Sequence, residues 1–378
     1  MKIMHNINLI KSSIRSSQGN LDETVQAIKN SNITISSKDV PTMEEMINIP
    51  YFVFEEKIQE NKKDIYEAIK SVVSDVIVDL SEDDRAQTAL IIGTSQVDLN
   101  TTDSIINTIY EKEPYPSSCV KRSIDSYAKD LSKEFGLNDY TMTIATACTS
   151  SANAVLEASN LIDAGIFKYV VIVGVEIFSS MMSSGFSSMK LLSLSSQKPF
   201  DNSREGLVLG EAIASVLLGK DNSSWSLKGG FSNCDSATIT SVSESGDEFA
   251  KVMRNALEVS GVSIEDITAL KAHATSTPTN DIAEANAISK VFDESITFTA
   301  IKPYIGHTLG ACGALELAIF MAAIDDGFIP KTINHSDSIY KNYVPILEHK
   351  ECESGLFMLN YFGFGGNNTS LIIQKEKS

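Results

Sequence analysis

The chain has 378 residues, enough to bury a large core or to hold two domain-sized units. Its formal net charge of −18 at pH 7 argues against nucleic-acid binding, which needs a basic surface. The five cysteines are widely spaced and form no Cys-x-x-Cys pair, which argues against a disulfide framework or a zinc ribbon. With neither a signal peptide nor an apolar run that could span a membrane, we expect a cytoplasmic protein without a bound metal.

Helical and strand-like segments alternate along the first part of the chain. Apolar residues recur every three or four positions in the expected helices, whereas the expected strands are short apolar runs. The expected helices cover residues 61–80, 118–136 and 151–165, and the expected strands cover 88–95, 141–147 and 169–176. The last strand is apolar throughout, as in a central strand covered on both faces, and the alternation indicates an α/β fold.

The polar stretch 219–226 is the candidate join between two halves, which we place at residues 1–220 and 221–378. After it the alternation returns, with expected helices at 247–261, 280–292 and 310–327 and expected strands at 267–275 and 296–302. The segments 148–165 and 310–327 are equally long, rich in small residues, and end in Asp-x-Gly or Asp-Gly. This similarity indicates an internal duplication.

Cys148 lies among small residues directly before the expected helix 151–165. At the first turn of a helix, free N–H groups and the helix dipole favour an anion. We therefore expect a lowered thiol pKa and a larger thiolate fraction at this position. The alternative is a buried cysteine that packs as a small apolar side chain, and this segment alone favours that alternative.

Two of the five histidines, His273 and His307, follow strand-like segments and are surrounded by Gly, Thr and Ser. Each is either a structural histidine or part of a polar site, and their similar positions at strand-to-helix turns favour the second interpretation. The other three, His5, His335 and His349, lie in polar or charged contexts that predict surface positions.

The segment 360–370 interleaves Gly363, Gly365 and Gly366 with two phenylalanines. Glycine lets the backbone approach a ligand closely, and N–H groups in such a turn can form half of an oxyanion hole. A tight turn at the end of a domain is the alternative. The pattern is not a phosphate-binding loop, because no GxxxxGK[ST] or strand-to-helix GxGxxG is present.

Five motifs resemble, in order, those of the β-ketoacyl-[acyl-carrier-protein] synthases of the thiolase-like superfamily. They are TACTSS at 146–151, PFDNSREGLVLGE at 199–211, HATSTPTND at 273–281, KPYIGHTLGACG at 302–313 and FGFGGNN at 362–368. The resemblance covers about residues 88 to 373. It implies a thiolase-like α/β fold, in which two pseudo-duplicated halves form a layered αβαβα core.

The resemblance implies a catalytic role for four residues. Cys148 would accept the acyl group, and His273 and His307 would bind the malonyl thioester carbonyl. Lys302 would orient the histidine pair and would itself be held by Glu284. Attack of a thiolate on an acyl thioester leaves an acyl-enzyme, and malonyl decarboxylation then produces an enolate that needs preorganised donors. Attack of this enolate on the acyl-enzyme gives a 3-oxoacyl product two carbons longer.

The resemblance also implies residues that bind the substrate. The amides of Cys148 and Phe364 would form the oxyanion hole, and the Phe364 ring would gate the acyl pocket. Thr275 and Thr277 would contact the phosphopantetheine arm. The remaining supporting or substrate-contacting residues would be Asp281, Gly365, Gly366, Phe362, Met182 and Phe186, the last two from the stretch 178–193 that we expect to line the acyl pocket.

The subtype and partners follow from the same resemblance. His307 favours the elongating type of synthase, which uses Cys-His-His, over the initiating type, which uses Cys-His-Asn. Cys352 lacks the glycine-rich context of the second catalytic cysteine of thiolases, which argues against a thiolase. The implied partners are an acyl carrier protein and a second ketosynthase subunit, in a homodimer or in a heterodimer with a chain-length-factor-like protein. No cofactor is implied, because the substrates are carried on 4′-phosphopantetheine.

Two other functions are alternatives: a non-catalytic chain-length-factor-like partner, and an acyltransferase without condensation. Such partners typically lose the nucleophile, whereas all four implied catalytic residues are retained here. Cysteine and histidine also serve simple acyl transfer, so the sequence excludes the acyltransferase less well.

The sequence departs from the usual family pattern at several positions. Lys271 and Ala274 replace Glu and Gly of the usual EAHGT, GEAIA at 210–214 replaces GEGAG, and the N-terminal strand motif is not recognisable at 7–17. These departures suggest a specialised pathway, such as that of aryl polyenes. For docking of an acidic carrier protein we expect a local basic patch near the pocket, with Lys62, Lys63, Lys251 and Arg254 as candidates.

Overall fold

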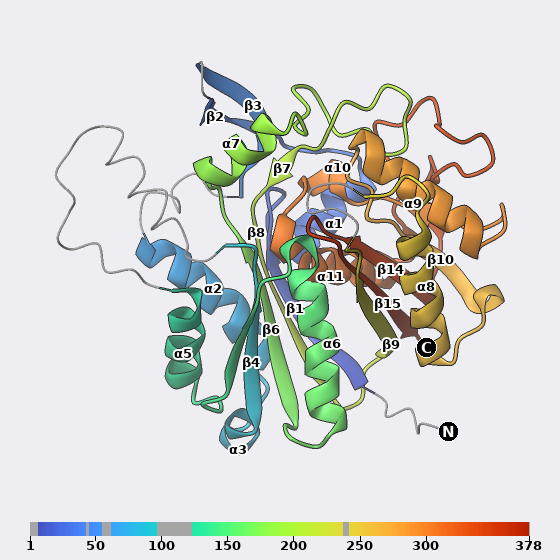
Figure 1. The fold of residues 1–378 in the computed structure, drawn as a ribbon. Helices are drawn as coiled ribbons and strands as arrows, with labels where there is room; N and C mark the ends of the chain where they lie inside the picture. The colour runs from blue at the N-terminus through green and yellow to red at the C-terminus, as the bar shows by residue number, and fades with distance from the viewer. Residues whose placement is uncertain (1–6, 43–44, 55–61, 97–122, 237–241, 378) are drawn as a thin grey trace.

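The computed structural model describes residues 7–42, 45–54, 62–96, 123–236 and 242–377 (Figure 1). The strands of one half are β1 (Ile7–Arg15), β8 (Ala212–Gly219), β6 (Tyr169–Glu176), β4 (Thr88–Gly93) and β5 (Thr141–Ile144). Those of the other half are β9 (Trp225–Cys234), β15 (Asn367–Lys375), β14 (Gly355–Phe362), β10 (Ile267–Lys271) and β11 (Phe298–Thr299). Together they form a 10-stranded sheet in the order β11-β10-β14-β15-β9-β1-β8-β6-β4-β5.

The two halves repeat one pairing pattern. From β1 to β5, and again from β9 to β11, two antiparallel pairs are followed by two parallel pairs. The halves join where β1 pairs with β9, through Ile7↔Leu227 and Asn8↔Ser226. The strand topology therefore confirms the internal duplication, and the proposed boundary at 220/221 lies in the connection between β8 and β9.

Helices cover both faces of each half and complete five layers. The helices between the halves are α1 (Leu21–Lys29), α6 (Ser150–Asp163) and α11 (Cys312–Asp325). The outer helices are α2 (Lys62–Ile77) and α5 (Ile124–Phe135) against the first half, and α8 (Asp247–Ser260) and α9 (Pro278–Val291) against the second (Figure 1). Helix α11 is buried except at Ala322 and Asp325, as expected for a helix between the two halves of the sheet. The predicted αβαβα arrangement is confirmed.

The remaining elements are short. They are the helices α3 (Glu82–Ala86), α7 (Ser180–Ser188) and α10 (Lys302–Ile305), the 3₁₀ turns η2 (Ala147–Thr149), η3 (Ile264–Asp266) and η4 (Leu309–Ala311), and the strands β2 (Ser36–Pro41), β3 (Met46–Phe52), β7 (Leu209–Gly210), β12 (Phe328–Ile329) and β13 (Lys350–Glu351). Among the described helices, none is both long and apolar enough to cross a membrane.

Some boundaries differ from the sequence prediction. The segment 7–17, in which no family motif was recognisable, contains β1. The start of the predicted helix 118–136 lies outside the described residues, and its described part is α5. The predicted strand 267–275 ends at Lys271, because the next residues form a loop with left-handed backbone at Ala274 (φ 53°).

The two central helices α6 and α11 contact each other almost backbone to backbone. Each follows a 3₁₀ turn whose first residue has positive φ, 52° at Ala147 and 41° at Leu309. A Cβ on Gly313 would lie 2.1 Å from the backbone nitrogen of Ala152. The Ser151 hydroxyl donates to the carbonyl of Gly310 at 2.6 Å across the same contact. The small residues that indicated a duplication therefore allow this crossing.

We expect Gly313→Ala to destabilise the fold by about 1–3 kcal/mol, because the added methyl group overlaps main-chain atoms that cannot rotate away. Thermal unfolding measures the change. Gly185→Ala in α7 is the matched control, since a Cβ there meets nothing within 4 Å and alanine favours a helix. Equal melting temperatures for the two variants would contradict the close crossing.

Candidate active site

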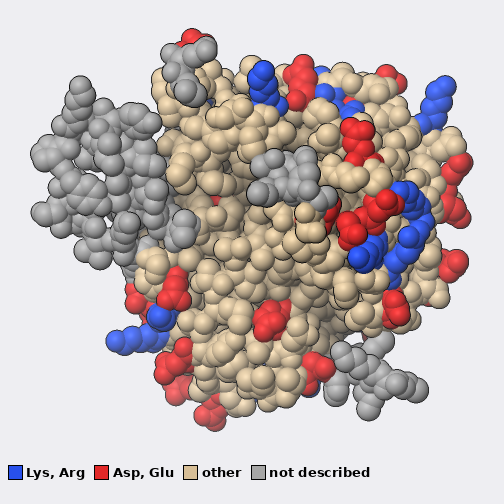
Figure 2. Space-filling view, in the orientation of Figure 1, with Lys and Arg blue, Asp and Glu red and all other residues tan. Residues whose placement is uncertain are grey.

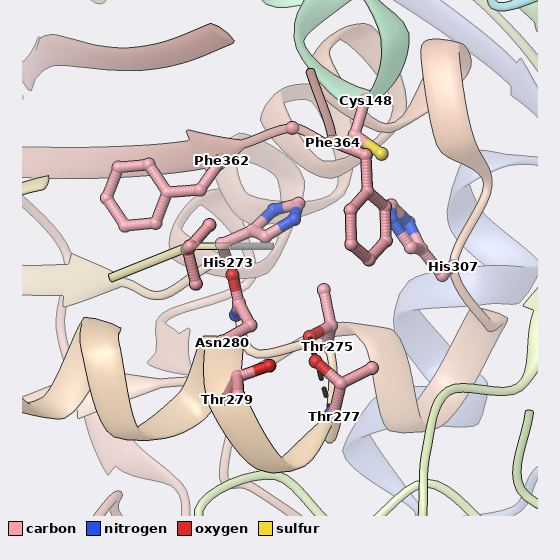
Figure 3. A pocket seen from close by; sticks show the side chains of 11 residues that line it. Cys148, His273, Thr275, Thr277, Thr279, Asn280, His307, Phe362 and Phe364 are labelled. Atoms are coloured by element: carbon pink, nitrogen blue, oxygen red, sulfur yellow. Dashed lines mark hydrogen bonds between the residues drawn. The ribbon is translucent and has the colours of Figure 1, made fainter. Parts of the chain in front are cut away.

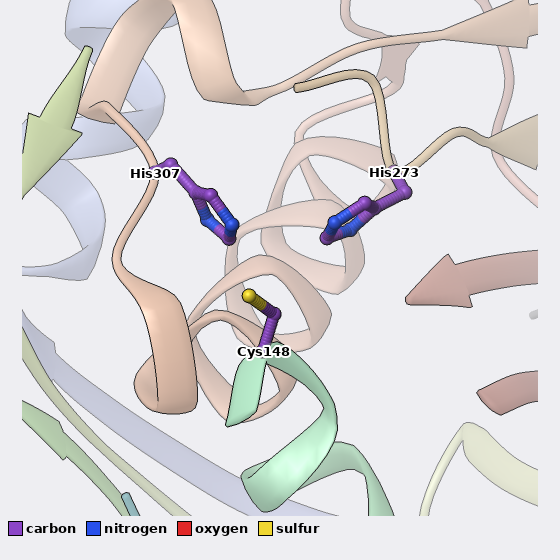
Figure 4. Close-up of side chains that lie close together, drawn as sticks. All are labelled: Cys148, His273 and His307. Atoms are coloured by element: carbon purple, nitrogen blue, oxygen red, sulfur yellow. The ribbon is translucent and has the colours of Figure 1, made fainter. Parts of the chain in front are cut away.

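A thiol and two imidazoles from both halves meet at the ends of strands. Cys148 lies in η2 after β5, His273 follows β10, and His307 lies between α10 and η4. The Cys148 sulfur and one ring nitrogen of each histidine all lie within 4.8 Å of one another, and the three residues are buried. Figure 4 shows both rings turned towards the thiol. The two ring planes make an angle of 84°. The structure therefore brings together the three residues that the sequence singled out.

A buried lysine determines which nitrogen of His273 carries hydrogen. Lys302 Nζ lies 3.2 Å from Nδ1 of His273 and 2.6 Å from Oε1 of Glu316. Burial lowers the pKa of His273 well below its usual value, and the charge of Lys302 lowers it further. A neutral ring that accepts from an ammonium group at Nδ1 carries its hydrogen at Nε2. That nitrogen has no hydrogen-bond partner among the described residues, so it is free to donate to a substrate.

Burial also lowers the pKa of His307 well below its usual value, with Lys302 and Lys271 as further causes. Neither of its ring nitrogens has a partner in the described part of the chain. Two neutral imidazoles, one of them with a defined N–H, therefore face the same space beside the thiol.

Two pockets meet at Cys148 and Phe364. The first is narrow and is also lined by both histidines, Thr275, Thr277 and Phe362 (Figure 3). The hydroxyls of the two threonines lie 3.0 Å apart. The second pocket is apolar, has a volume of about 240 Å³, and is lined by Met182, Phe186 and other residues of α7 and its flanks. Phe364 lines both pockets, and its ring centroid lies 5.9 Å from that of Phe186.

Comparison with known proteins is consistent with this arrangement. Residues 59–223 match the beta-ketoacyl synthase N-terminal domain, and residues 226–336 match the C-terminal domain. The 3-oxoacyl-[acyl-carrier-protein] synthase 2 of Rhizobium meliloti is 30% identical over 320 residues, which cover 78% of this chain and 76% of that protein. The chain belongs to the β-ketoacyl synthase family.

Other members of the β-ketoacyl synthase family agree in length and fold. A putative mitochondrial 3-oxoacyl-[acyl-carrier-protein] synthase of Schizosaccharomyces pombe is 29% identical, over 79% of this chain and 77% of that protein. The ketosynthase ApeO of Xenorhabdus doucetiae, solved with its chain length factor ApeC, has a TM-score of 0.84, with 23% identity and 98% coverage of both chains. A type II PKS ketosynthase, AntDE, solved with the acyl-carrier protein AntF, has a TM-score of 0.87, with 19% identity and 99% and 100% coverage.

The thiol of this β-ketoacyl synthase is less acidic than its position before α6 suggested. Burial raises the pKa of Cys148 to about 11, although Lys302 and the backbone N–H of Phe364 both act to lower it. The expected lowering of the pKa is therefore wrong, because the loss of hydration outweighs the helix start and the nearby cation. The proton of Cys148 has to leave during the reaction.

Glu284 and Asp281 are the two acids implied by the family motifs. They hydrogen-bond to the loop after β10, whereas Glu284 was expected to hold Lys302. Both oxygens of Glu284 accept backbone N–H groups, from His273 and Ala274, each at 2.7 Å. The expected Glu284–Lys302 pair is not formed, since Lys302 pairs with Glu316. Burial raises the pKa of Glu284 to about 7.

Asp281 holds the next part of the loop by accepting the backbone N–H of Ser276 at 3.0 Å and of Phe200 at 2.8 Å.

Sequence analysis missed Glu316 as a site residue. An acid within the apolar run 314–324 was the signal, because an acidic residue is almost never fully buried unless it is paired.

Of the remaining predicted residues, Phe362 lines a pocket, whereas Gly365 and Gly366 shape the loop next to it. The Phe362 ring stacks on Phe249, with centroids 3.8 Å apart, while also lining the narrow pocket. Gly365 and Gly366 line neither pocket but turn the loop that carries Phe364, with φ of 82° and 81°. A Cβ on Gly366 would overlap the backbone of a neighbouring loop.

The expected basic patch stays a prediction. The side chains of Lys62 and Lys63 lie outside the described residues. On α8, Lys251 pairs with Glu248 at 3.4 Å and Arg254 donates to the carbonyl of Lys290. Figure 2 shows basic side chains over α8 and α9, with acidic ones among them.

We expect alkylation of Cys148 by iodoacetamide to accelerate with pH up to about 11, because only the thiolate reacts and burial keeps the thiol protonated at neutral pH. Mass spectrometry of the Cys148 peptide measures the rate and separates it from that of the exposed Cys234. In Lys302→Met the pH at half-maximal rate should move upward, since a nearby positive charge is lost. A rate for Cys148 that is already constant above pH 8 would show that the pKa is not raised.

Proposed function

We propose that the chain is a 3-oxoacyl-[acyl-carrier-protein] synthase, a condensing enzyme with Cys148 as its nucleophile. The observation that carries this proposal is the position of the thiol, at the meeting point of a narrow polar pocket and an apolar pocket of about 240 Å³. One pocket suits a thioester arm and the other an acyl chain. Both histidines lie beside the point at which the two substrates meet.

The first step transfers the acyl group to the enzyme. The Cys148 sulfur attacks the acyl thioester of the carrier, the bond to the carrier sulfur breaks, and the carrier thiol leaves with the proton that the cysteine loses. The backbone N–H groups of Cys148 and Phe364 lie close enough to the sulfur to influence its pKa. We assign these two amides to the negatively charged oxygen of the tetrahedral intermediate. The acyl chain then occupies the apolar pocket beside Met182 and Phe186.

The second step forms the new carbon–carbon bond. The malonyl carboxylate leaves as CO₂, and the electron pair of the broken bond moves onto the thioester oxygen as an enolate. The hydrogen at Nε2 of His273 and an N–H of His307 stabilise this charge. The positive charge of Lys302, next to Nδ1 of His273, adds to this stabilisation. The enolate carbon attacks the acyl carbonyl, and Cys148 is expelled as a thiolate that takes up a proton. The product is a 3-oxoacyl thioester.

The acyl carrier protein is the proposed donor of both substrates, with its phosphopantetheine arm passing between Thr275, Thr277 and Phe364. The second subunit is a ketosynthase, identical or chain-length-factor-like, and β5, an edge strand of the sheet among the described residues, is the candidate to pair with it. The ketosynthase ApeO was solved in complex with its chain length factor, which supports a second subunit of this kind. A specialised cytoplasmic pathway, such as that of aryl polyenes, fits the sequence departures at Lys271 and Ala274.

We expect the intact mass to increase by one acyl group when the protein is mixed with acyl-carrier substrates, because Cys148 retains the acyl group as a thioester. Addition of malonyl carrier should then release a 3-oxoacyl carrier, which distinguishes condensation from simple acyl transfer. Cys148→Ala should form no adduct, whereas Cys234→Ala, which removes an exposed thiol, should behave as the wild type. An adduct without condensation product would favour the acyltransferase, and no adduct, with or without a partner subunit, would favour the non-catalytic partner.

A further inference from the structure

Lys271, two residues before His273, is a buried cation whose three ammonium hydrogens all have acceptors. Its Nζ lies 2.5 Å from Oε2 of Glu316 and 2.7 Å from the carbonyl oxygen of Asn360. It also lies 3.8 Å from the ring centroid of Tyr361. A lysine side chain has three N–H donors, so a carboxylate, a carbonyl and an aromatic face satisfy the charged form completely.

A single carboxylate joins this lysine to the histidine pair. Glu316 binds Lys271 through Oε2 and Lys302 through Oε1, at 2.5 and 2.6 Å. Lys302 in turn lies 3.2 Å from Nδ1 of His273. If Lys271 were absent, Oε2 would be buried without its cation, and both carboxylate oxygens would compete for Lys302. The ammonium group of Lys302 would then be drawn away from the histidine.

We propose that Lys271 is a positioning residue for the condensation: it holds Glu316 so that Lys302 stays against Nδ1 of His273 and the ring hydrogen stays at Nε2. This inference rests on the proposed function, in which that hydrogen binds the enolate oxygen. Because Lys271 also binds the carbonyl of Asn360 on β14, it ties the histidine pair to the strand that leads into the Phe364 loop.

Lys271 also contributes to the charge of the site. The titratable groups around it are Glu316 and Cys312 on α11, Lys302 on α10, Tyr361 on β14, Glu284 on α9, and His273 and His307 beyond them. Two lysines against the carboxylate of Glu316 favour neutral imidazoles, and Lys271 contributes to the low pKa of both histidines. Loss of this positive charge should therefore raise the pKa of His273.

The test compares Lys271→Met with the wild type. We expect kcat for CO₂ release from malonyl carrier to fall about tenfold with KM unchanged, the size of effect expected when a charged hydrogen bond no longer orients a reacting group. In ¹⁵N-histidine NMR, the signal of His273 should change from hydrogen at Nε2 alone to a mixture of tautomers and should titrate at higher pH. A purely structural role for Lys271 would change neither the tautomer nor the titration.

Lys375→Met is the matched control. Lys375 has the same three kinds of partner, namely Asp325 Oδ1 at 2.6 Å, the carbonyl of Ile324 at 3.3 Å and the Trp225 ring at 5.9 Å. These residues lie at the other end of α11, so the control should keep wild-type kcat and His273 titration. Lys271→Gln keeps N–H donors but not the charge, and should retain kcat within about threefold while raising the pKa of His273.

The outcomes separate the two proposals. Wild-type kcat and an unchanged His273 signal in a folded Lys271→Met would overturn the positioning role. If Lys271→Met does not fold, Lys271→Gln decides: because it keeps N–H donors, a mixture of His273 tautomers or a tenfold lower kcat in this variant would overturn the positioning role instead. Absence of CO₂ release from the wild type would contradict the proposed function, whereas the NMR comparison would still decide whether Lys271 sets the state of His273.

Discussion

The close contact between α6 and α11 is the constraint on which the rest of the site depends. Because Gly313 lies against the backbone of Ala152, the start of α6 and the first turns of α11 occupy the same small volume between the two halves of the sheet. Cys148 lies at the start of one helix and Glu316 early in the other. Any side chain larger than hydrogen at Gly313 would separate them. The small residues of both helices thus bring the nucleophile of one half to the charges of the other.

The same crossing buries the site, and burial is the largest influence on the pKa of its thiol and of both imidazoles. Cys148 is kept protonated, both histidines are kept neutral, and the pKa of Glu284 is raised to about 7. A buried charge needs strong partners, and Glu316 forms ion pairs with two lysines. In such surroundings a hydrogen held at a particular nitrogen is an effective donor, because little water competes with it.

Much of this could be predicted from the sequence, because local patterns reflect local structure. The apolar run 169–176 coincides with β6, and the two segments rich in small residues are the central helices. Other features depend on three-dimensional packing. Spacing does not show which of two buried acids faces Lys302, so Glu316 was missed, and the pKa of Cys148 depends on a burial depth that no local pattern records. Strand β1 has half-buried polar positions in its middle, which concealed it.

The central claim is that the two histidines, and not the thiol, stabilise the enolate. CO₂ release from malonyl carrier by Cys148→Ala tests this most directly, compared with the same variant that also carries His273→Ala or His307→Ala. The account predicts that decarboxylation persists without the thiol and falls about a hundredfold or more when either imidazole is removed. Equal CO₂ release from the single and double variants would contradict it.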